Sequence, residues 1–174
     1  MNLKLFNNQY IFDFKFYIPT RQDTLMNKVQ KYMDKYGLGG NRDLILTIIK
    51  HMSNKDYAIF SNPNDEQEYI QCTVDENGIV IDFPFSVIDK RSKLLHRLDY
   101  VILKNDLRKT QSIFGNSYIY EMTKNDYGSA IDIYCRQNPV LAAKIMHEIL
   151  TEVYSLDPEF KMDIKIDTWK KFWF

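Results

Sequence analysis

The segment 75–78, with the sequence DENG, constrains the fold of this chain more than any other segment. It separates EYIQCTV at 68–74 from IVIDFPF at 79–85, two runs in which apolar and polar residues alternate. Alternation with period two is typical of strands, and Asn-Gly readily adopts the positive φ of a two-residue turn. The pattern therefore predicts an antiparallel hairpin. Its second strand should leave the sheet at Pro84, because proline has no N–H to donate.

Other alternating runs predict further strands, and apolar residues spaced three and four apart predict helices. A second hairpin is expected from SYIYEMT at 117–123 and SAIDIYC at 129–135, and Asn138-Pro139 is a typical helix start. Residues 100–103 fit either a short strand or a helix end, and 104–112 fit a loop. The remaining expected strands are 9–18, 57–61 and 160–166, and the expected helices are 22–36, 42–52, 87–98 and the one that follows Asn138.

The order of these elements indicates the fold class. A strand and a helix are followed by a helix, three strands, a helix, two strands, a helix and a last strand. This order predicts an α+β domain in which an antiparallel sheet of about five to six strands packs against helices. A chain of 174 residues suits one domain. We divide it into a strand–helix extension at 1–40, a core at 41–166 and an aromatic tail at 167–174.

Three segments carry a family resemblance: EYIQCTVDENGIVIDFPF, NSYIYEMTKNDYGSAIDIYC and NPVLAAKIMHEILTEVYSL. In element order and apolar pattern they resemble the type III secretion chaperone-like superfamily, which includes the Tir-chaperone and YbjN-like groups. The resemblance covers about residues 42–155. It implies a domain that binds other proteins and often forms a homodimer.

Charge and apolar content argue against several partner classes. The chain has 23 Lys and Arg residues and 23 Asp and Glu residues, so its net charge is zero. Nucleic-acid binding usually shows as a basic excess, and no apolar run approaches the ~20 residues that span a bilayer. We therefore expect neither nucleic acid nor a membrane as a partner. The absence of a signal-peptide pattern at the N-terminus predicts a cytoplasmic protein, in which Cys72 and Cys135 are buried, reduced thiols.

No local motif predicts catalysis, a cofactor or a metal. His147-Glu148 begins the HExxH pattern of zinc proteases, but Thr151 stands in place of the second histidine. The sequence GLGGN at 37–41 lacks the preceding strand and the Lys-Ser/Thr ending of a phosphate-binding loop, and it fits a hinge between two helices. We therefore expect no catalytic, cofactor-binding or metal-binding residue, and the sequence favours a protein that is not an enzyme.

Acidic residues interrupt three of the expected strands. By alternation, Asp82, Glu121 and Asp132 could share a sheet face with Tyr69 and Tyr134. One interpretation of this set is an acidic–aromatic patch for a basic segment of a partner, or a cation site. The other is the solvated face of an antiparallel sheet, with no specific role.

The C-terminal tail is dense in aromatic side chains, which seldom stay fully solvated. Three interpretations are open: packing on the domain, self-association, or contact with a partner or a membrane surface. The residues concerned are Trp169, Phe172, Trp173 and Phe174.

These observations favour a non-enzymatic protein-binding module, chaperone-like or of the inhibitor or immunity type. It would present a sheet face, or a strand edge, to another protein, and it could also form a homodimer. One alternative is a small enzyme or nucleotide-sensing domain whose site assembles from dispersed residues. Another is a structural subunit of a larger assembly.

Overall fold

A computed structural model gives the structure of this protein. Several expectations lie outside the residues that it describes, among them the second half of the strand at 9–18 and the four tail aromatics Trp169, Phe172, Trp173 and Phe174. The described residues are 3–6, 9–12, 20–84, 91–109, 119–125 and 128–168.

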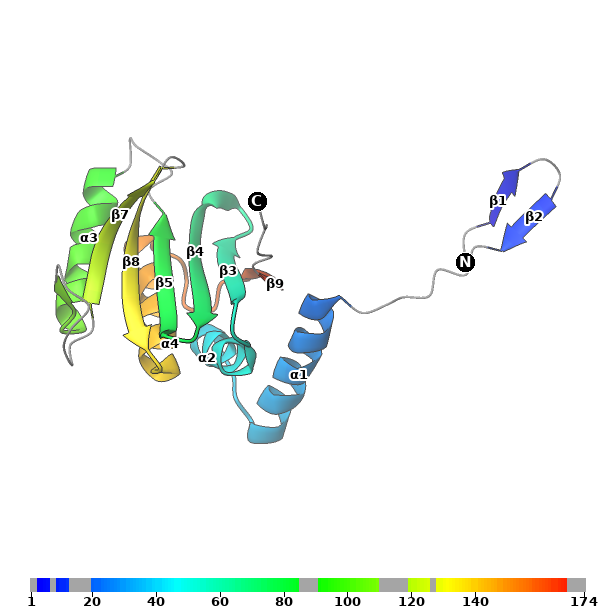
Figure 1. Cartoon of the computed structure of the whole chain (residues 1–174), viewed down its shortest axis with the longest axis horizontal. Coiled ribbons are helices and arrows are strands. Elements are labelled where there is room, and N and C mark those ends of the chain that lie inside the picture. The colour runs from blue at the N-terminus through cyan, green and yellow to red at the C-terminus, as the bar shows by residue number, and fades with distance from the viewer. Residues whose placement is uncertain are drawn as a thin grey trace.

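The helices form close to where the sequence predicts them (Figure 1). The residues 100–103, which fitted a strand or a helix end, belong to a helix. No helix within the described ranges is long and apolar enough to cross a membrane. The helices are α1 (Arg21–Tyr36), α2 (Asn41–His51), α3 (Arg91–Lys104) and α4 (Pro139–Glu148), which a short π-helical segment, η1 (Ile149–Val153), continues.

Local hydrogen bonds explain where two of these helices begin. The Thr20 hydroxyl accepts from the Asp23 N–H at 3.2 Å, and the Asp23 carboxylate accepts from the Thr20 N–H at 2.9 Å. This reciprocal pair is a capping box for α1. Asn138 caps α4 through the Leu141 N–H at 3.0 Å, with Pro139 at the first helical position, as the sequence predicts.

The strands form two sheets in the described part of the chain. A hairpin of β1 (Leu3–Phe6) and β2 (Gln9–Phe12) is the smaller one, and β1 was not predicted. The larger sheet has seven strands in the order β6-β7-β8-β5-β4-β3-β9. They are β3 (Asp56–Asn62), β4 (Asp65–Asp75), β5 (Gly78–Pro84), β6 (Arg108–Lys109), β7 (Ile119–Asn125), β8 (Gly128–Arg136) and β9 (Asp163–Thr168).

The large sheet confirms the predicted α+β class. All neighbouring strands pair antiparallel except β6 and β7, which are parallel. The β6 strand lies in the stretch 104–112 that we predicted as a loop. A strand of two residues is too short to show any alternation, so the sequence could not reveal it.

The hairpin at 75–78 forms, but not through the predicted Asn-Gly turn: Glu76 and Asn77 occupy the turn without a positive φ, and only Gly78, the first residue of β5, has one. Asp75 pairs with Gly78, and Asp75 Oδ1 accepts from the N–H groups of Asn77 at 2.7 Å and Gly78 at 3.0 Å. Gly78 has φ of 132°, and a Cβ there would lie 2.4 Å from the carbonyl carbon of Arg136 on β8. Both the turn and the close approach of β8 therefore require glycine at this position.

The last strand starts later than predicted. Asn41 Nδ2 donates to the carbonyls of Pro158 and Phe160, each at 2.9 Å, and so holds this segment against the start of α2. β9 begins at Asp163, after this segment, instead of at residue 160. It also includes Asp167 and Thr168, which we had assigned to the tail.

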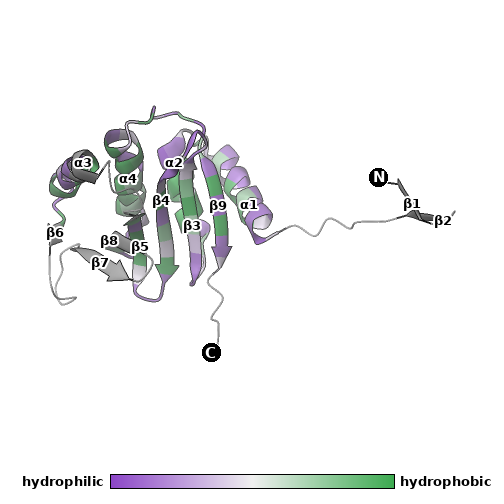
Figure 2. Cartoon of the chain, turned by 90° about the horizontal axis from the view of Figure 1, so that it is seen from above, coloured by the Kyte–Doolittle hydropathy of each residue, from purple (hydrophilic) through white to green (hydrophobic). Residues whose placement is uncertain are grey.

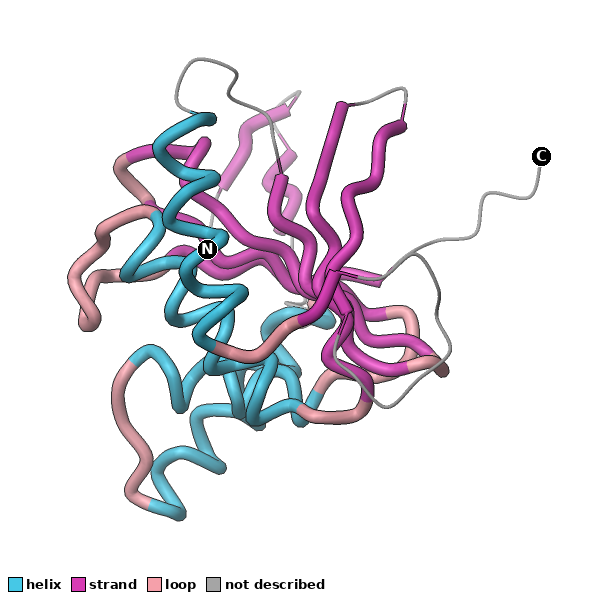
Figure 3. Tube along the Cα trace, turned by 90° about the vertical axis from the view of Figure 1, so that its left-hand side faces the viewer, coloured by secondary structure: helices cyan, strands magenta, loops and turns pink. Residues whose placement is uncertain are grey.

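The helices gather on one side of the large sheet. Figure 2 shows α2, α3 and α4 along that side, with α1 next to β9, and Figure 3 shows the same separation from a second direction. The core lies between the two layers and includes Phe60, Ile81 and Ile133 from the sheet and Ile48 and Met146 from the helices, all fully buried. Burial of each such side chain contributes roughly 1.5–3 kcal/mol. Leu25 and Val29 of α1 join this core, so the predicted N-terminal extension contributes to it.

Candidate functional site

Alternation along the strands gives the large sheet two different faces. On β5, Ile79, Ile81 and Phe83 are buried, whereas Val80 and Asp82 are only half-buried. The buried set faces the helical layer. The opposite set lies on a face over which Figure 2 shows none of the described helices.

We call this second surface the open face. Its members are half-buried side chains on β3, β4, β5 and β8, together with the register position of Glu121 on β7. Strand pairing assigns them to one face, because directly opposed residues in an antiparallel sheet point to the same side. They are Tyr57, Ile59, Tyr69, Gln71, Thr73, Val80, Asp82, Asp132, Tyr134 and Glu121.

Three acidic residues of the open face stand in one row across adjacent strands. Asp132 pairs with Asp82 on one side and with Glu121 on the other. Directly opposed residues lie about 4.5–5.5 Å apart at Cβ, and opposed like charges are unfavourable. The pair of Asp82 and Asp132 therefore concentrates negative charge at some cost to stability.

The pKa of Asp82 reflects this arrangement. Burial, followed by repulsion from Asp132, raises the pKa of Asp82 from 3.8 to about 6. Asp82 is therefore mostly ionised at pH 7, and it becomes protonated and uncharged as the pH falls below about 6.

Aromatic and aliphatic side chains border the acidic row. Tyr134 pairs with Val80, and this pair lies next to the pair of Asp132 and Asp82 on the same face. Tyr69 is close by on β4, because it lies two residues before Gln71, which pairs with Asp82. Four of the strand residues singled out from the sequence, Tyr69, Asp82, Asp132 and Tyr134, thus map to one face of one sheet, and Glu121 has the matching register position on β7. Whether they bind a partner stays a prediction.

The thiols of the chain do not offer a nucleophile. Cys72 and Cys135 are both free and buried on the helical side of the sheet. Burial raises the pKa of the Cys72 thiol, with a further contribution from Cys135, and burial raises the pKa of Cys135 to about 12. Neither is a thiolate near neutral pH, and only the thiolate is strongly nucleophilic.

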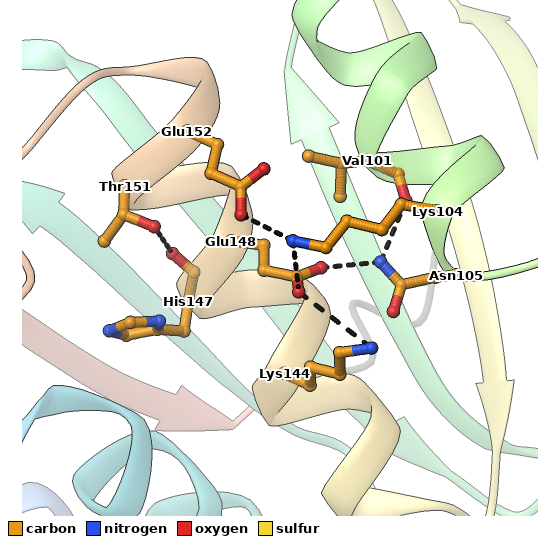
Figure 4. Close-up of polar contacts among 8 residues, drawn as sticks. All are labelled: Val101, Lys104, Asn105, Lys144, His147, Glu148, Thr151 and Glu152. Carbon is orange, nitrogen blue, oxygen red and sulfur yellow. Dashed lines mark hydrogen bonds and ion pairs between the residues drawn. The ribbon is translucent and has the colours of Figure 1, made fainter.

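The partial zinc-protease motif has a different role in the structure. Glu148 is buried and belongs to a polar cluster with α3, whereas Figure 4 shows the His147 ring directed away from it. Thr151 donates through its hydroxyl to the His147 carbonyl at 2.8 Å. Within the described ranges, no three His, Cys, Asp or Glu residues gather as a metal site would require.

The polar cluster around Glu148 is a second concentration of charge, which the sequence analysis missed. Lys104, at the end of α3, contacts Glu148 at 3.0 Å and Glu152 at 2.7 Å (Figure 4). Hydrogen bonds from Lys104 to Glu152 and Glu148 raise the pKa of its ammonium group. Asn105 Nδ2 donates to Glu148 at 2.6 Å and to the Val101 carbonyl at 2.8 Å. These contacts hold the end of α3 against α4 and η1, so the cluster stabilises the packing of the helices.

Comparisons of this chain with models of protein families, with curated proteins and with solved structures find no match. The geometry and chemistry of the open face are therefore the basis on which a function can be assigned to this chain.

Proposed function

We propose that this chain is a non-enzymatic protein-binding module that engages its partner through the open face of the large sheet. The observation that carries the proposal is the cross-strand row of Glu121, Asp132 and Asp82 beside Tyr134 and Val80. This combination of charge and apolar surface suits a macromolecular partner more than a small substrate, because it is spread over several strands.

The chemistry of the face favours a basic segment with apolar side chains. Lys or Arg side chains above the acidic row would relieve the repulsion between Asp82 and Asp132. Opposite charge across an interface mainly steers encounter and selects partners. Contact with Tyr69, Val80 and Tyr134 would add burial of apolar area, at about 25 cal/mol per Å² before the entropic cost of association.

The resemblance to the type III secretion chaperone-like superfamily also supports a protein-binding role. Such a domain would act as a chaperone-like protein, or as an inhibitor or immunity protein, in the cytoplasm. A homodimer is compatible with this proposal. Its interface would lie elsewhere on the molecule, so that the open face stays available to a different partner.

The test is affinity capture from the native host, followed by mass spectrometry. The wild-type chain is compared with Asp82→Asn/Asp132→Asn, which removes two charges and preserves side-chain shape. The matched control is Asp99→Asn/Glu159→Gln, which removes two charges from exposed residues outside the open face.

We expect a stoichiometric protein partner with the wild type and the control, and its loss with the open-face variant. Capture that is equal with all three chains would contradict the use of this face. Recovery of the chain without a protein partner, but with a tightly held small molecule, would favour the enzyme or sensor alternative instead.

A further inference from the structure

The outer edge of β9 is covered by a side chain. β9 is the last strand of the sheet order, so no described strand pairs with its outer side. Gln22, in the first turn of α1, lies there instead. Gln22 Nε2 donates to the Ile164 carbonyl at 2.9 Å, and Gln22 Oε1 accepts from the Ile166 N–H at 3.3 Å.

These two bonds imitate strand pairing. An antiparallel neighbour would bond to the N–H and C=O groups of every second residue along the edge. The primary amide of Gln22 offers one donor and one acceptor, as a peptide group does. One glutamine therefore satisfies two of the groups that an added strand would use, and unsatisfied edge groups are a template for pairing with another chain.

An ion pair between the half-exposed Arg21 and the buried Asp56 holds the first turn of α1 at this edge. Asp56, with 0% of its side chain exposed, accepts from Arg21 Nη2 at 2.6 Å and from the Thr168 hydroxyl at 3.0 Å. Arg21 directly precedes Gln22, and Thr168 is the last residue of β9. The contact to Asp56 therefore joins the two elements that meet at the covered edge.

The covered edge is complementary in charge to a second copy of itself. When two β9 strands pair antiparallel with Ile166 opposite Ile166, Lys165 of each copy faces Asp167 of the other. Both side chains are exposed, and opposed opposite charges are favourable. A register with Lys165 opposite Lys165 would instead set like charges together. The two-fold arrangement makes the favourable contact twice.

We propose that the outer edge of β9 is a pairing surface for a second copy of this chain, and that Gln22 keeps it closed. Release of the first turn of α1 exposes the Ile164 and Ile166 backbone groups, and two sheets then join through their β9 strands. The backbone edge of β9 does not depend on the proposed function, although Lys165 and Asp167 pair with Ile59 and Tyr57 and therefore lie on the same side of the sheet as the open face.

The test compares Thr20→Ala with Thr20→Ala/Gln22→Ala. The single variant loses the helix cap alone, and the double variant also loses both edge bonds. Light scattering after gel filtration, over a series of protein concentrations, reports the oligomeric state. We expect the double variant to self-associate at least tenfold more tightly than the single variant.

Charge variants test whether the association uses β9. Adding Lys165→Glu to the double variant places Glu opposite Asp167 and should reverse the self-association. Adding Lys165→Glu together with Asp167→Lys exchanges the two charges and should restore it. Self-association that is unaffected by Lys165→Glu would overturn the proposal, because it would use another surface.

A further variant separates loss of the edge bonds from loss of the fold. Gln22→Glu retains an acceptor for the Ile166 N–H but cannot donate to the Ile164 carbonyl, and an acidic residue is favourable in the first turn of a helix. We expect it to fold and to self-associate more than the wild type. If both Gln22 variants keep their circular dichroism spectra and stay as monomeric as Thr20→Ala, the proposal is wrong.

Discussion

The two faces of the large sheet are built from the same strands but differ in chemistry. The face toward the helices is apolar and fully buried, as Ile81 and Ile133 show. The open face has Asp82 and Asp132 in the same strands, one residue away from those buried positions, and these acids oppose each other. Adjacent positions along a strand thus differ completely in environment.

Under the proposed function, this difference separates stability from recognition. Apolar burial on the helical side supplies the folding free energy, whereas the open face accepts charge repulsion that a purely structural surface would avoid. An arrangement that costs stability is a reason to look for function at that position.

Truncation at neighbouring positions should produce the largest contrast. Ile81→Ala removes a side chain with 0% exposure and should cost about 3 kcal/mol of unfolding free energy, because it leaves a cavity. Val80→Ala, on the half-buried open face, should cost less than about 1 kcal/mol. Urea denaturation of both variants measures this contrast, and equal losses would refute the division into two faces.

A change at the hairpin should disturb the register on which both faces depend. Gly78→Ala forces a Cβ against the Arg136 backbone, 2.4 Å away, in a conformation that alanine rarely adopts. We expect a loss of about 2–3 kcal/mol. Gly39→Ala is the matched control, since nothing lies within 4 Å of its Cβ, and it should change stability by less than about 0.5 kcal/mol. Thermal or urea unfolding of the Gly78→Ala and Gly39→Ala variants measures this difference. Similar losses of stability in both variants would contradict this account of the turn.

Removing one charge from the open face should stabilise the protein. Asp82→Asn abolishes the repulsion with Asp132 and the cost of burying an ionised group. One pKa unit corresponds to about 1.4 kcal/mol, but solvent screens this partly exposed carboxylate, so we expect a gain of only about 1 kcal/mol at pH 7. Urea denaturation measures the free energy of unfolding of Asp82→Asn. Asp99→Asn is the control, and its stability should equal that of the wild type.

The stability gain of Asp82→Asn over the wild type should depend on pH. Because the folded pKa of Asp82 is raised from 3.8 to about 6, the folded chain binds this proton more tightly than the unfolded chain. Stability is therefore lost as pH rises between these two values, and the full cost is present above pH 6. The advantage of Asp82→Asn over the wild type should vanish near pH 4. An advantage that is constant from pH 4 to pH 7 would contradict the assigned cause.

Local features of the fold could be predicted from the sequence because their causes are local. The turn at 75–78, the start of α4 at Asn138 and the α+β class follow from residues close together in the chain. The position of β5 between β4 and β8 could not be predicted, because pairing between distant strands depends on the whole core. The start of β9 was also missed, and the segment before it bonds to the distant side chain of Asn41, a contact that the local pattern does not reveal.

The candidate site shows the same limit. Alternation was enough to assign Asp82 and Asp132 to matching sides of their strands. The register that sets them opposite each other, and the resulting pKa of Asp82, required the structure. The bonds from Gln22 to β9 were also invisible in the sequence, because they join residues more than a hundred positions apart.

Photo-crosslinking from a single position tests the central claim most directly. A photoreactive phenylalanine analogue replaces Thr73 on the open face or, in the control chain, Leu103 on α3, which is 75% exposed. After irradiation in the native host, we predict a covalent adduct with a partner protein from position 73 and none from position 103. Adducts from position 103 alone would contradict the assignment of the binding surface to the open face.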